Sequence, residues 1–318
     1  MNKCLLCYKQ IVDEEFIEYE FHKSCSRKFF GKNAAPILDY THSEILKLAE
    51  KVVKSQKTVT GVQPKLSINS CKMTEDSAIE RFTIVGLWGK FILKPQTVLY
   101  EQLPEIEDLT MNLAALSKIK TVEHSLIRLK SGELAYITKR IDRLKNRKLH
   151  MEDMCQLTER QTEHKYKGSY EQVAKTIKKY SSNPGLDIVN FYELVLFCFL
   201  TGNNDMHLKN FSLLKAIDLD YNLCPAYDLV ASELVVEGDD EELALNLNGK
   251  KKKIKKKDFL IAMKTSGMND KSIENVFKKF ESLQNKWQNL IHTSFLSNEF
   301  KENYRNMIKE KFNQLEIN

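Results

Sequence analysis

The sequence predicts an α+β protein in which a strand-rich N-terminal lobe precedes a helical C-terminal lobe. Three observations favour this class: a period-two pattern between Val59 and Leu93, a helix start at Pro104, and mostly helical patterns beyond about residue 150. The chain has 318 residues, 42% of them hydrophobic. At about 100 to 200 residues per domain, this length predicts two domains or one domain with two lobes.

Composition excludes several classes of protein. The hydrophobic content excludes disorder and collagen, and 49 Lys and Arg against 43 Asp and Glu do not by themselves indicate a nucleic-acid partner. The longest apolar stretch, 191–200, is interrupted by Glu193 and is about half of the roughly 20 residues that span a bilayer. No signal-peptide pattern opens the chain, and seven cysteines favour reduced thiols. We expect a cytoplasmic protein without a membrane segment.

The first thirty residues contain the pattern C-x2-C-x14-H-x2-C, formed by Cys4, Cys7, His22 and Cys25. Zn²⁺ prefers four thiolate or imidazole ligands in a tetrahedron, and two short pairs supply them at a small cost in chain entropy. The spacing predicts a structural Zn²⁺ in a small module over residues 1–35. The alternative is that the two early cysteines are ordinary small hydrophobic residues near a chain end.

The N-terminal lobe is assigned to residues 36–148. Residues 41–53 carry the apolar stripe of an amphipathic helix. The run RFTIVGLWGKFILKP predicts two strands joined by a turn at Gly86 to Gly89, and the second strand ends at Lys94. Pro104 opens a helix with acidic residues in its first turn, and a strand is expected at Leu134 to Ile141.

The C-terminal lobe is assigned to residues 149–318. Ser169 and Gln172 form a capping-box pattern, and the apolar run 191–200 reads as a buried helix. Two long helices are expected at the end, with core stripes at Ile273, Val276, Phe277, Phe280, Trp287 and Ile291, and at Phe300, Tyr304, Ile308 and Phe312. A strand-rich lobe followed by a helical one is the outline of a two-lobed protein-kinase-like fold.

The polar run GNNDMHLKN, residues 202–210, is the strongest candidate for chemistry. Asp205 and Asn210 have the spacing of the kinase aspartate that accepts a hydroxyl proton and the asparagine that holds magnesium. Asp228 follows as a second carboxylate, and Mg²⁺ prefers such hard oxygen ligands. His207 and Lys209 orient the loop or a substrate phosphate, or are structural. The alternative for the whole run is a turn, since Asn and Asp favour turn geometry.

A second candidate set lies in the N-terminal lobe. Lys94 ends a strand where a kinase lysine reaches ATP phosphates, and Glu107 in the next helix is its expected partner. A solvated strand end is the alternative. The segment TVTGVQPKL, residues 58–66, occupies the place of a phosphate-covering loop, although Gly61 is its sole glycine.

The lysine run 250–257 supports a rival function. Leu243, Leu245 and Leu247 alternate before the hairpin signal Asn248-Gly249, and seven lysines follow within eight positions. We favour a solvated hairpin edge, because no aromatic residues are interleaved. The rival reading is a non-catalytic nucleic-acid-binding regulator that uses this run together with the zinc module. A third possibility is phosphorylation of a small molecule such as an aminoglycoside.

Several motifs in order resemble the catalytic part of HipA-type serine/threonine kinases, the toxins of bacterial toxin–antitoxin modules. They are TGVQPKLSI, FILKP, LPEIEDLTMNLA, KRIDR, HMEDMCQ, KYKGSYE, GNNDMHLKNFSLL and PAYDLV, over about residues 55–250. The resemblance implies Asp205 as catalytic base, Asn210 and Asp228 as Mg²⁺ ligands, and Lys94 on the ATP phosphates. It further implies an adenine hinge at the backbone of 139–141, which includes Lys139 and Ile141, and phosphate-loop contacts from Gly61 and Gln63.

The resemblance also implies regulation and partners. The family phosphorylates its own phosphate loop just before the glycine, where Thr58 and Thr60 stand here in place of the usual serine. Such a phosphate would repel those of ATP. Full-length HipA proteins begin with a domain that we expect here as a separate small antitoxin protein, beside a helix-turn-helix DNA-binding antitoxin that makes DNA an indirect partner. The family's known targets are aminoacyl-tRNA synthetases.

Overall fold

The computed structural model describes residues 2–56, 63–72, 80–85, 88–144, 147–215, 220–236, 238 and 240–317. The chain divides into two compact units. Unit 1 comprises Met1–Asp108, Val122–Ile141 and Thr293–Phe295, and unit 2 comprises Leu109–Thr121, Asp142–His292 and Leu296–Asn318. The predicted residues therefore fall into two sets, one in each unit.

Unit 1 is built on a five-stranded sheet. Its strands are β1 (Leu66–Lys72), β2 (Glu80–Ile84), β3 (Phe91–Pro95), β4 (His124–Arg128) and β5 (Leu134–Lys139). Its helices are α1 (Glu14–Ile17), α2 (Lys23–Phe30), α3 (His42–Gln56) and the start of α4 (Leu103–Leu116). The predicted helix over 41–53 and the predicted strand at 134–141 correspond to α3 and β5.

The sheet has the order β2-β1-β3-β5-β4, and all neighbours in it are antiparallel. The two strands expected from RFTIVGLWGKFILKP exist as β2 and β3, but they are not neighbours. Strand β1 lies between them and pairs Ile68 with both Ile84 and Phe91. The core side chains of β1 alternate, since Leu66 and Ile68 are buried.

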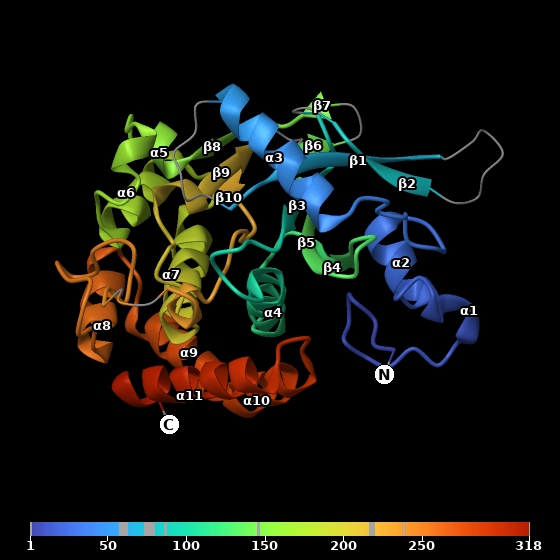
Figure 1. The fold of residues 1–318 in the computed structure, drawn as a ribbon. Coiled ribbons are helices and arrows are strands. Elements are labelled where there is room, and N and C mark those ends of the chain that lie inside the picture. Colours follow the sequence, from blue (N-terminus) through green and yellow to red (C-terminus); the bar gives the residue numbers. More distant parts are fainter. Residues whose placement is uncertain are drawn as a thin grey trace. The chain divides into compact units, whose positions relative to one another are not determined.

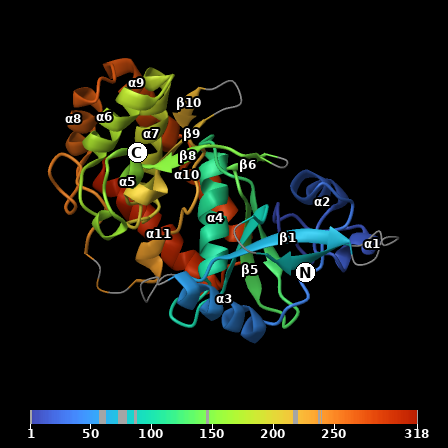
Figure 2. The ribbon, with the colours of Figure 1, turned by 90° about the horizontal axis from the view of Figure 1, so that it is seen from above.

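Two helices position the chemistry of unit 1. Helix α3 packs against β3, and Figure 1 shows it crossing the sheet. Helix α4, drawn along its length in Figure 2, starts in unit 1 and ends in unit 2. The terminal helices of unit 2 hold its second half and the residue after it: Thr110 Oγ1 lies 2.9 Å from the Tyr304 hydroxyl, and Ser117 Oγ, directly after α4, accepts from Trp287 Nε1 at 3.0 Å.

Unit 2 is mostly helical. Its helices are α5 (Met154–Leu157), α6 (Tyr170–Tyr180), α7 (Pro184–Leu200), α8 (Lys256–Thr265), α9 (Asp270–Glu281), α10 (Gln284–Thr293) and α11 (Asn298–Gln314). Short 3-10 helices cover Thr162–His164, Leu208–Asn210 and Ser232–Leu234. The strands β8 (Met151–Asp153), β9 (Ser212–Lys215) and β10 (Tyr221–Leu223) form a small sheet, and β6 (Arg143–Leu144) pairs with β7 (Arg147–Lys148).

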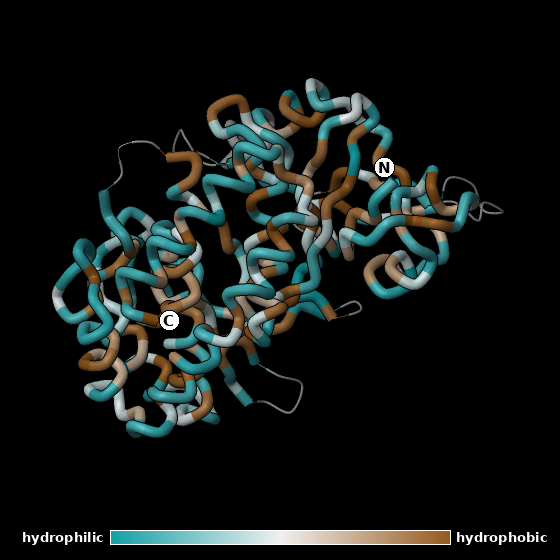
Figure 3. Tube along the Cα trace, turned by 90° about the horizontal axis from the view of Figure 1, so that it is seen from below, coloured by the Kyte–Doolittle hydropathy of each residue, from teal (hydrophilic) through white to brown (hydrophobic). Residues whose placement is uncertain are grey.

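Helix α7 is the buried centre of unit 2, as its apolar run predicts. Every residue from Phe191 to Leu200 is buried except Glu193, which pairs with Lys279 of α9 at 2.6 Å. Figure 3 shows hydrophobic and hydrophilic residues alternating along the helices near the C-terminus. In the described part of the chain, no helix is both long and apolar enough to cross a membrane.

The terminal helices differ from the expected pair, because the first of them is divided. Helix α9 ends at Glu281 and α10 begins at Gln284. At the break, Ser282 Oγ donates to the Lys279 carbonyl at 2.8 Å, a side-chain bond that competes with continuation of the helix. The capping box at α6 is half formed: Ser169 Oγ accepts from Gln172 N at 3.2 Å, whereas Gln172 Oε1 accepts from Arg160.

Candidate functional site

In unit 1, Lys94 and Glu107 form a buried ion pair. Lys94 Nζ lies 2.5 Å from Glu107 Oε1, and the two residues are 3% and 0% exposed. Strand β3 supplies the lysine and the first turns of α4 supply the glutamate. Lys94 Nζ also lies 5.4 Å from the centre of the Tyr136 ring in β5. The ion pair expected from the sequence is therefore present. A lysine this deeply buried requires a carboxylate partner of this kind.

The first turn of α4 carries a second acidic residue with unusual properties. Burial raises the pKa of the Glu105 carboxyl to about 7, and the nearby Asp108 acts in the same direction. Among the described residues, no group bonds to the buried Glu105 Oε2. Glu105 therefore titrates near neutral pH at the start of the helix that holds Glu107.

The predicted phosphate loop is described only in part. Thr58, Thr60 and Gly61 lie outside the described residues. Gln63 is half-buried, and no described residue accepts a hydrogen bond from its buried Nε2. A buried amide donor without an acceptor is costly, so this atom is suited to a ligand oxygen.

The predicted adenine hinge begins at the end of β5. The backbone N–H groups of Lys139 and Arg140 donate to the carbonyls of Glu123 and Lys90 at 2.9 and 2.8 Å. The Lys139 side chain pairs with Glu123. In the described part of the chain, no hydrogen bond uses the N–H of Ile141. Of the three predicted hinge residues, Ile141 is thus the one whose N–H donates to no described residue.

In unit 2, buried asparagines fix the loop at 202–210. Gly202 has φ +63, and a Cβ there would meet Met307 Sδ at 2.5 Å and Glu233 Cβ at 3.1 Å, so another residue would strain the backbone and displace the Met307 side chain. The N–H of Asn203 donates to the Cys198 carbonyl at the end of α7. Asn204 bonds the Ser232 hydroxyl and donates to the Glu241 carbonyl at 3.1 Å. The Asn-rich run is thus a turn anchored by buried side-chain and backbone hydrogen bonds.

This anchoring presents Asp205 to solvent while the residues around it are buried. The Asp205 carbonyl accepts from His207 N at 2.8 Å and from Asn210 Nδ2 at 3.1 Å. The Asp205 carboxylate accepts from the Tyr166 hydroxyl. Because Asn210 donates through Nδ2, its Oδ1 is the atom left to contact a cation. The structure therefore brings Asp205 and Asn210 together, as their spacing predicts.

Asp228 and His207 belong to the same part of unit 2. The carboxylates of Asp205 and Asp228 both act on the buried imidazole of His207, but burial outweighs them and lowers its pKa. Among the described residues, none bonds to the buried His207 Nδ1. Asp228 has φ +60, a backbone conformation that non-glycine residues adopt uncommonly and that is enriched at functional sites.

Lys209 is oriented by a carboxylate of the small sheet. Its Nζ lies 2.7 Å from Asp153 Oδ2, and its carbonyl accepts from the Tyr227 hydroxyl at 3.1 Å. Asp153 also caps helix α5 through Oδ1, which accepts from Gln156 N at 2.9 Å. Lys209 therefore ties the loop to β8 and α5, which is the loop-orienting alternative of the sequence analysis.

The Cys/His pattern converges in unit 1. One donor atom from each of Cys4, Cys7, His22 and Cys25 lies within 4.8 Å of the others. His22 Nδ1 faces the sulfurs of Cys7 and Cys25 at 3.4 and 3.8 Å. Hydrogen bonds from Cys25 and Cys7 lower the pKa of Cys4. This donor set fits a Zn²⁺ ion.

Three of the seven lysines of the run form ion pairs within the described part of the chain. Lys250 contacts Asp258 at 2.9 Å, Lys251 contacts Glu241 at 2.9 Å, and Lys252 contacts Asp240. The turn at Asn248-Gly249 is present, with Leu247 and Lys250 bonded across it, but the described residues 240–250 contain only isolated bridges and no strand. The expected hairpin edge is therefore a compact turn, and the first three lysines of the run pair with acidic residues.

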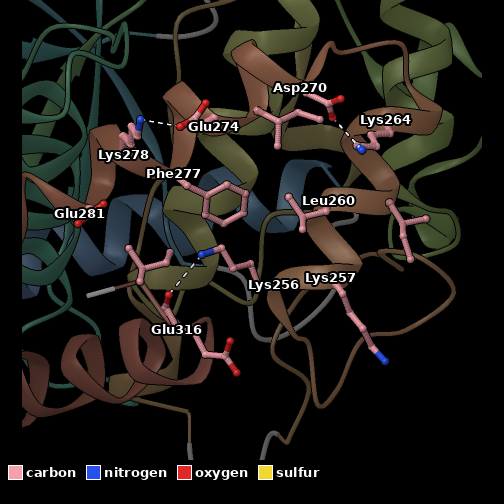
Figure 4. A pocket seen from close by; sticks show the side chains of 13 residues that line it. Lys256, Lys257, Leu260, Lys264, Asp270, Glu274, Phe277, Lys278, Glu281 and Glu316 are labelled. Atoms are coloured by element: carbon pink, nitrogen blue, oxygen red, sulfur yellow. Dashed lines mark hydrogen bonds and ion pairs between the residues drawn. The ribbon is translucent and has the colours of Figure 1, made fainter.

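A surface groove of about 730 Å³ lies elsewhere on unit 2, between α8, α9 and the chain end (Figure 4). Leu260, Phe277 and Ile317 provide its apolar wall. Its rim is paired internally, as in the 2.8 Å contact of Lys264 with Asp270. None of the predicted site residues lines this groove.

Sequence reasoning missed the residues that support the site. Tyr166 bonds Asp205 across 39 positions, and Asp153 bonds Lys209 across 56 positions. Tyr8 and Asp108 are joined across 100 positions. Tyr166 stood in the motif KYKGSYE without a role, and no local pattern marks the others.

Two comparisons with known sequences bear on this chain. Residues 58–287 match the HipA-like C-terminal domain. A Sinorhizobium fredii protein named "Putative kinase Y4dM" is 34% identical over 179 residues, which cover 52% of this chain and 43% of that protein. A Haemophilus influenzae protein named "Putative kinase" is 28% identical over 247 residues, which cover 73% of this chain and 68% of that protein. The chain thus spans less than half of the first relative.

Solved structures agree on the fold. HipA of Shewanella oneidensis, from its complex with HipB and operator DNA, has a TM-score of 0.67 at 18% identity and covers 84% of this chain and 70% of its own. The Helicobacter pylori proinflammatory kinase CtkA has a TM-score of 0.52 at 17% identity and covers 71% of this chain and 87% of its own. The predicted kinase-like fold is confirmed. With a family match over more than half of its length, the chain belongs to the HipA-like C-terminal domain family.

Proposed function

We propose that this protein is an ATP- and Mg²⁺-dependent serine/threonine protein kinase. The observation that carries the proposal is the loop 202–210, in which buried asparagines fix the backbone while the Asp205 carboxylate stays open to solvent. A base that takes a proton from a substrate hydroxyl has to be both positioned and accessible. The family match and the kinase-like fold support the same reading.

Each residue has a role in this proposal. Asp205 accepts the hydroxyl proton, and Tyr166 orients its carboxylate. Asn210 Oδ1 and the Asp228 carboxylate are hard oxygen donors that fit Mg²⁺, which would offset charge on the transferred phosphoryl group. Lys94, kept charged by Glu107, contacts the nucleotide phosphates. Gln63 Nε2 and the Ile141 N–H supply donors to the nucleotide.

Partners and regulation extend the proposal. The chain acts as the toxin of a bacterial toxin–antitoxin system and phosphorylates a translation component such as an aminoacyl-tRNA synthetase. It phosphorylates its own phosphate loop at Thr58 or Thr60, where added negative charge repels ATP. Its antitoxins are a helix-turn-helix DNA-binding protein and a small protein that resembles the HipA N-terminal domain. The HipA neighbour was solved with HipB and operator DNA, which supports the first of these partners.

Transfer of labelled phosphate from ATP to the chain tests the proposal. We expect Mg²⁺-dependent incorporation in the wild type and a loss of about 100-fold or more in Asp205→Asn, since a general base contributes that much. Asp270→Asn is the matched control, because this exposed aspartate pairs with Lys264 on the surface, away from the loop. Equal incorporation in the two variants would refute the role of Asp205.

The rival regulator function has less support. Lys250, Lys251 and Lys252 are neutralised by acidic residues of the same chain, which leaves fewer charges for phosphate groups. If the lysine run bound nucleic acid, affinity would fall steeply with salt, because released counterions drive such binding. We expect no binding that falls steeply with salt.

A further inference from the structure

In the Cys/His module, residues 4–9 form a tight turn of the kind found in metal sites, which we call the knuckle. The N–H of Tyr8 donates to the Cys4 carbonyl at 3.0 Å, and the N–H of Cys4 donates to the Lys9 carbonyl at 2.9 Å. Tyr8 follows Cys7 directly and has φ +64, so the chain turns sharply after the second cysteine. This turn brings both early thiols toward His22 and Cys25.

The imidazole in this module is held as a metal ligand would be. His22 Nδ1 faces the sulfurs, while Nε2 lies 3.0 Å from the Gln10 carbonyl. A carbonyl at the remote nitrogen fixes the tautomer that leaves the other nitrogen free to bind metal. Three thiols and one imidazole favour Zn²⁺ over hard cations such as Mg²⁺.

The module is joined to the sheet of unit 1 at its edge. Leu5, inside the knuckle, offers its carbonyl to strand β4: Ser125 Oγ and Leu126 N donate to it at 3.2 and 3.4 Å. Leu126 also packs in the apolar core of the module with Leu5 and Phe21. Strand β4 is the outer strand of the sheet, so the knuckle covers an edge that would otherwise expose backbone groups.

The residue after the knuckle reaches the helix of the ion pair. The Tyr8 hydroxyl donates to Asp108 Oδ2 at 2.6 Å, and His124 Nδ1 of β4 lies 2.7 Å from Asp108 Oδ1. All three side chains are buried. Asp108 directly follows Glu107 in α4, so both oxygens of its carboxylate fix the turn that presents Glu107.

The same contacts continue to the lysine. The His124 ring stacks on the Tyr136 ring with centres 5.7 Å apart, and Lys94 Nζ lies over that ring. Every link lies in unit 1. A buried polar network of this kind keeps its geometry only while each member keeps its partner.

We propose that Cys4, Cys7, His22 and Cys25 bind one Zn²⁺, and that the loaded knuckle positions Glu107 for Lys94 through the Tyr8–Asp108–His124 bonds. The metal then has a role beyond holding the N-terminus together. Tyr8, Asp108 and His124 are positioning residues, since they act on the ion pair through α4. The consequence for ATP rests on the proposed function, whereas metal binding and the state of α4 do not.

Metal analysis of the purified chain tests the first part. We expect about one zinc per chain in the wild type, as in closed four-ligand sites, and loss of zinc in Cys25→Ser. Cys71→Ser is the control, because Cys71 is an exposed cysteine of β1 outside the cluster. A wild type that carries no zinc after growth and dialysis with zinc chloride, or that carries iron instead, would overturn the assignment.

Hydrogen exchange of α4 tests the second part in a variant that keeps all four ligands. Tyr8→Phe removes only the hydroxyl, and we expect zinc to be retained while amides at the start of α4 exchange about three- to tenfold faster, the effect of one lost hydrogen bond. Tyr19→Phe, in the same module, is the matched control. Strands β9 and β10 of unit 2 serve as the internal reference. Unchanged α4 exchange in Tyr8→Phe would refute the positioning role.

Nucleotide affinity separates this inference from the proposed function. At a temperature well below unfolding, Tyr8→Phe should weaken Mg·ATP binding by about three- to tenfold, whereas Tyr19→Phe should not. If the wild type binds no ATP, the proposed function fails, and the exchange of α4 still decides the positioning role. Faster α4 exchange with unchanged ATP affinity would show that the knuckle holds the helix without serving the lysine, which contradicts the proposal.

Discussion

The ion pair of unit 1 and the loop of unit 2 differ in whether their charged side chains are buried or exposed. Lys94 and Glu107 are 3% and 0% exposed and bond each other, whereas Asp205 is exposed and stands on a backbone held by neutral asparagines. A buried charge requires a partner, and its loss harms folding. An exposed carboxylate on a fixed loop is available for proton transfer, and its loss harms chemistry. Variants in the two regions should therefore separate stability from activity.

The largest effect on stability is expected at the buried pair. Glu107→Ala leaves the Lys94 ammonium buried without this carboxylate, so the free energy of unfolding should fall by about 3–5 kcal/mol. Urea denaturation measures this change. Glu274→Ala is the control, since its pair with Lys278 lies on the exposed face of α9 and should contribute nothing measurable. Equal urea midpoints for Glu107→Ala and Glu274→Ala would contradict the expected dependence of folding on the buried pair.

A smaller, pH-dependent effect is expected at Glu105. Its pKa is about 7 in the folded chain against an ordinary 4.5, so the folded state binds an extra proton between these values. The free energy of unfolding therefore falls as pH rises from about 4.5 to about 7, by up to about 3 kcal/mol. Glu105→Gln should abolish this slope and be the more stable protein at high pH.

Urea denaturation over this pH range checks the slope. Glu101→Gln provides the control, because Glu101 is exposed and precedes α4. A wild-type slope that persists in Glu105→Gln would contradict the burial of this carboxyl.

The smallest effect is expected at Tyr166. Tyr166→Phe removes the hydroxyl that donates to the Asp205 carboxylate, and one such bond corresponds to about a two- to tenfold loss of phosphate transfer. Stability should not change, because Tyr166 is 42% exposed. Tyr180→Phe, at the exposed end of α6, is the matched control for rate and stability. A loss of stability without a loss of rate would show that the Tyr166 hydroxyl serves folding and not phosphate transfer.

The loop 202–210 and the Cys/His module were predictable from local spacing. Asp205 and Asn210 lie on one short loop, and two Cys/His pairs each span a single turn, so neighbours in sequence are neighbours in space. The expected strands β3 and β5 and helices α3, α4 and α7 followed from periodicity and capping residues.

Contacts between distant segments were not predictable. Strand β1 separates β2 from β3 because it pairs with both, and nothing in a local pattern fixes such an order. Tyr8, Asp108 and Tyr166 acquire their roles from partners 39 to 100 positions away. Three lysines of the run pair with Asp240, Glu241 and Asp258, which flank it on both sides, and composition alone did not show this pairing. These ion pairs reduce the charge that the lysine run, seen in the composition as a basic segment, offers to a partner.

Calorimetric titration with a non-hydrolysable ATP analogue tests the central claim most directly. The account predicts Mg²⁺-dependent binding in the wild type and a loss of about tenfold or more in both Lys94→Met and Asp228→Asn, since one residue contacts phosphate and the other holds the ion. Wild-type binding that is equal with and without Mg²⁺, or unchanged affinity in Asp228→Asn, would contradict it.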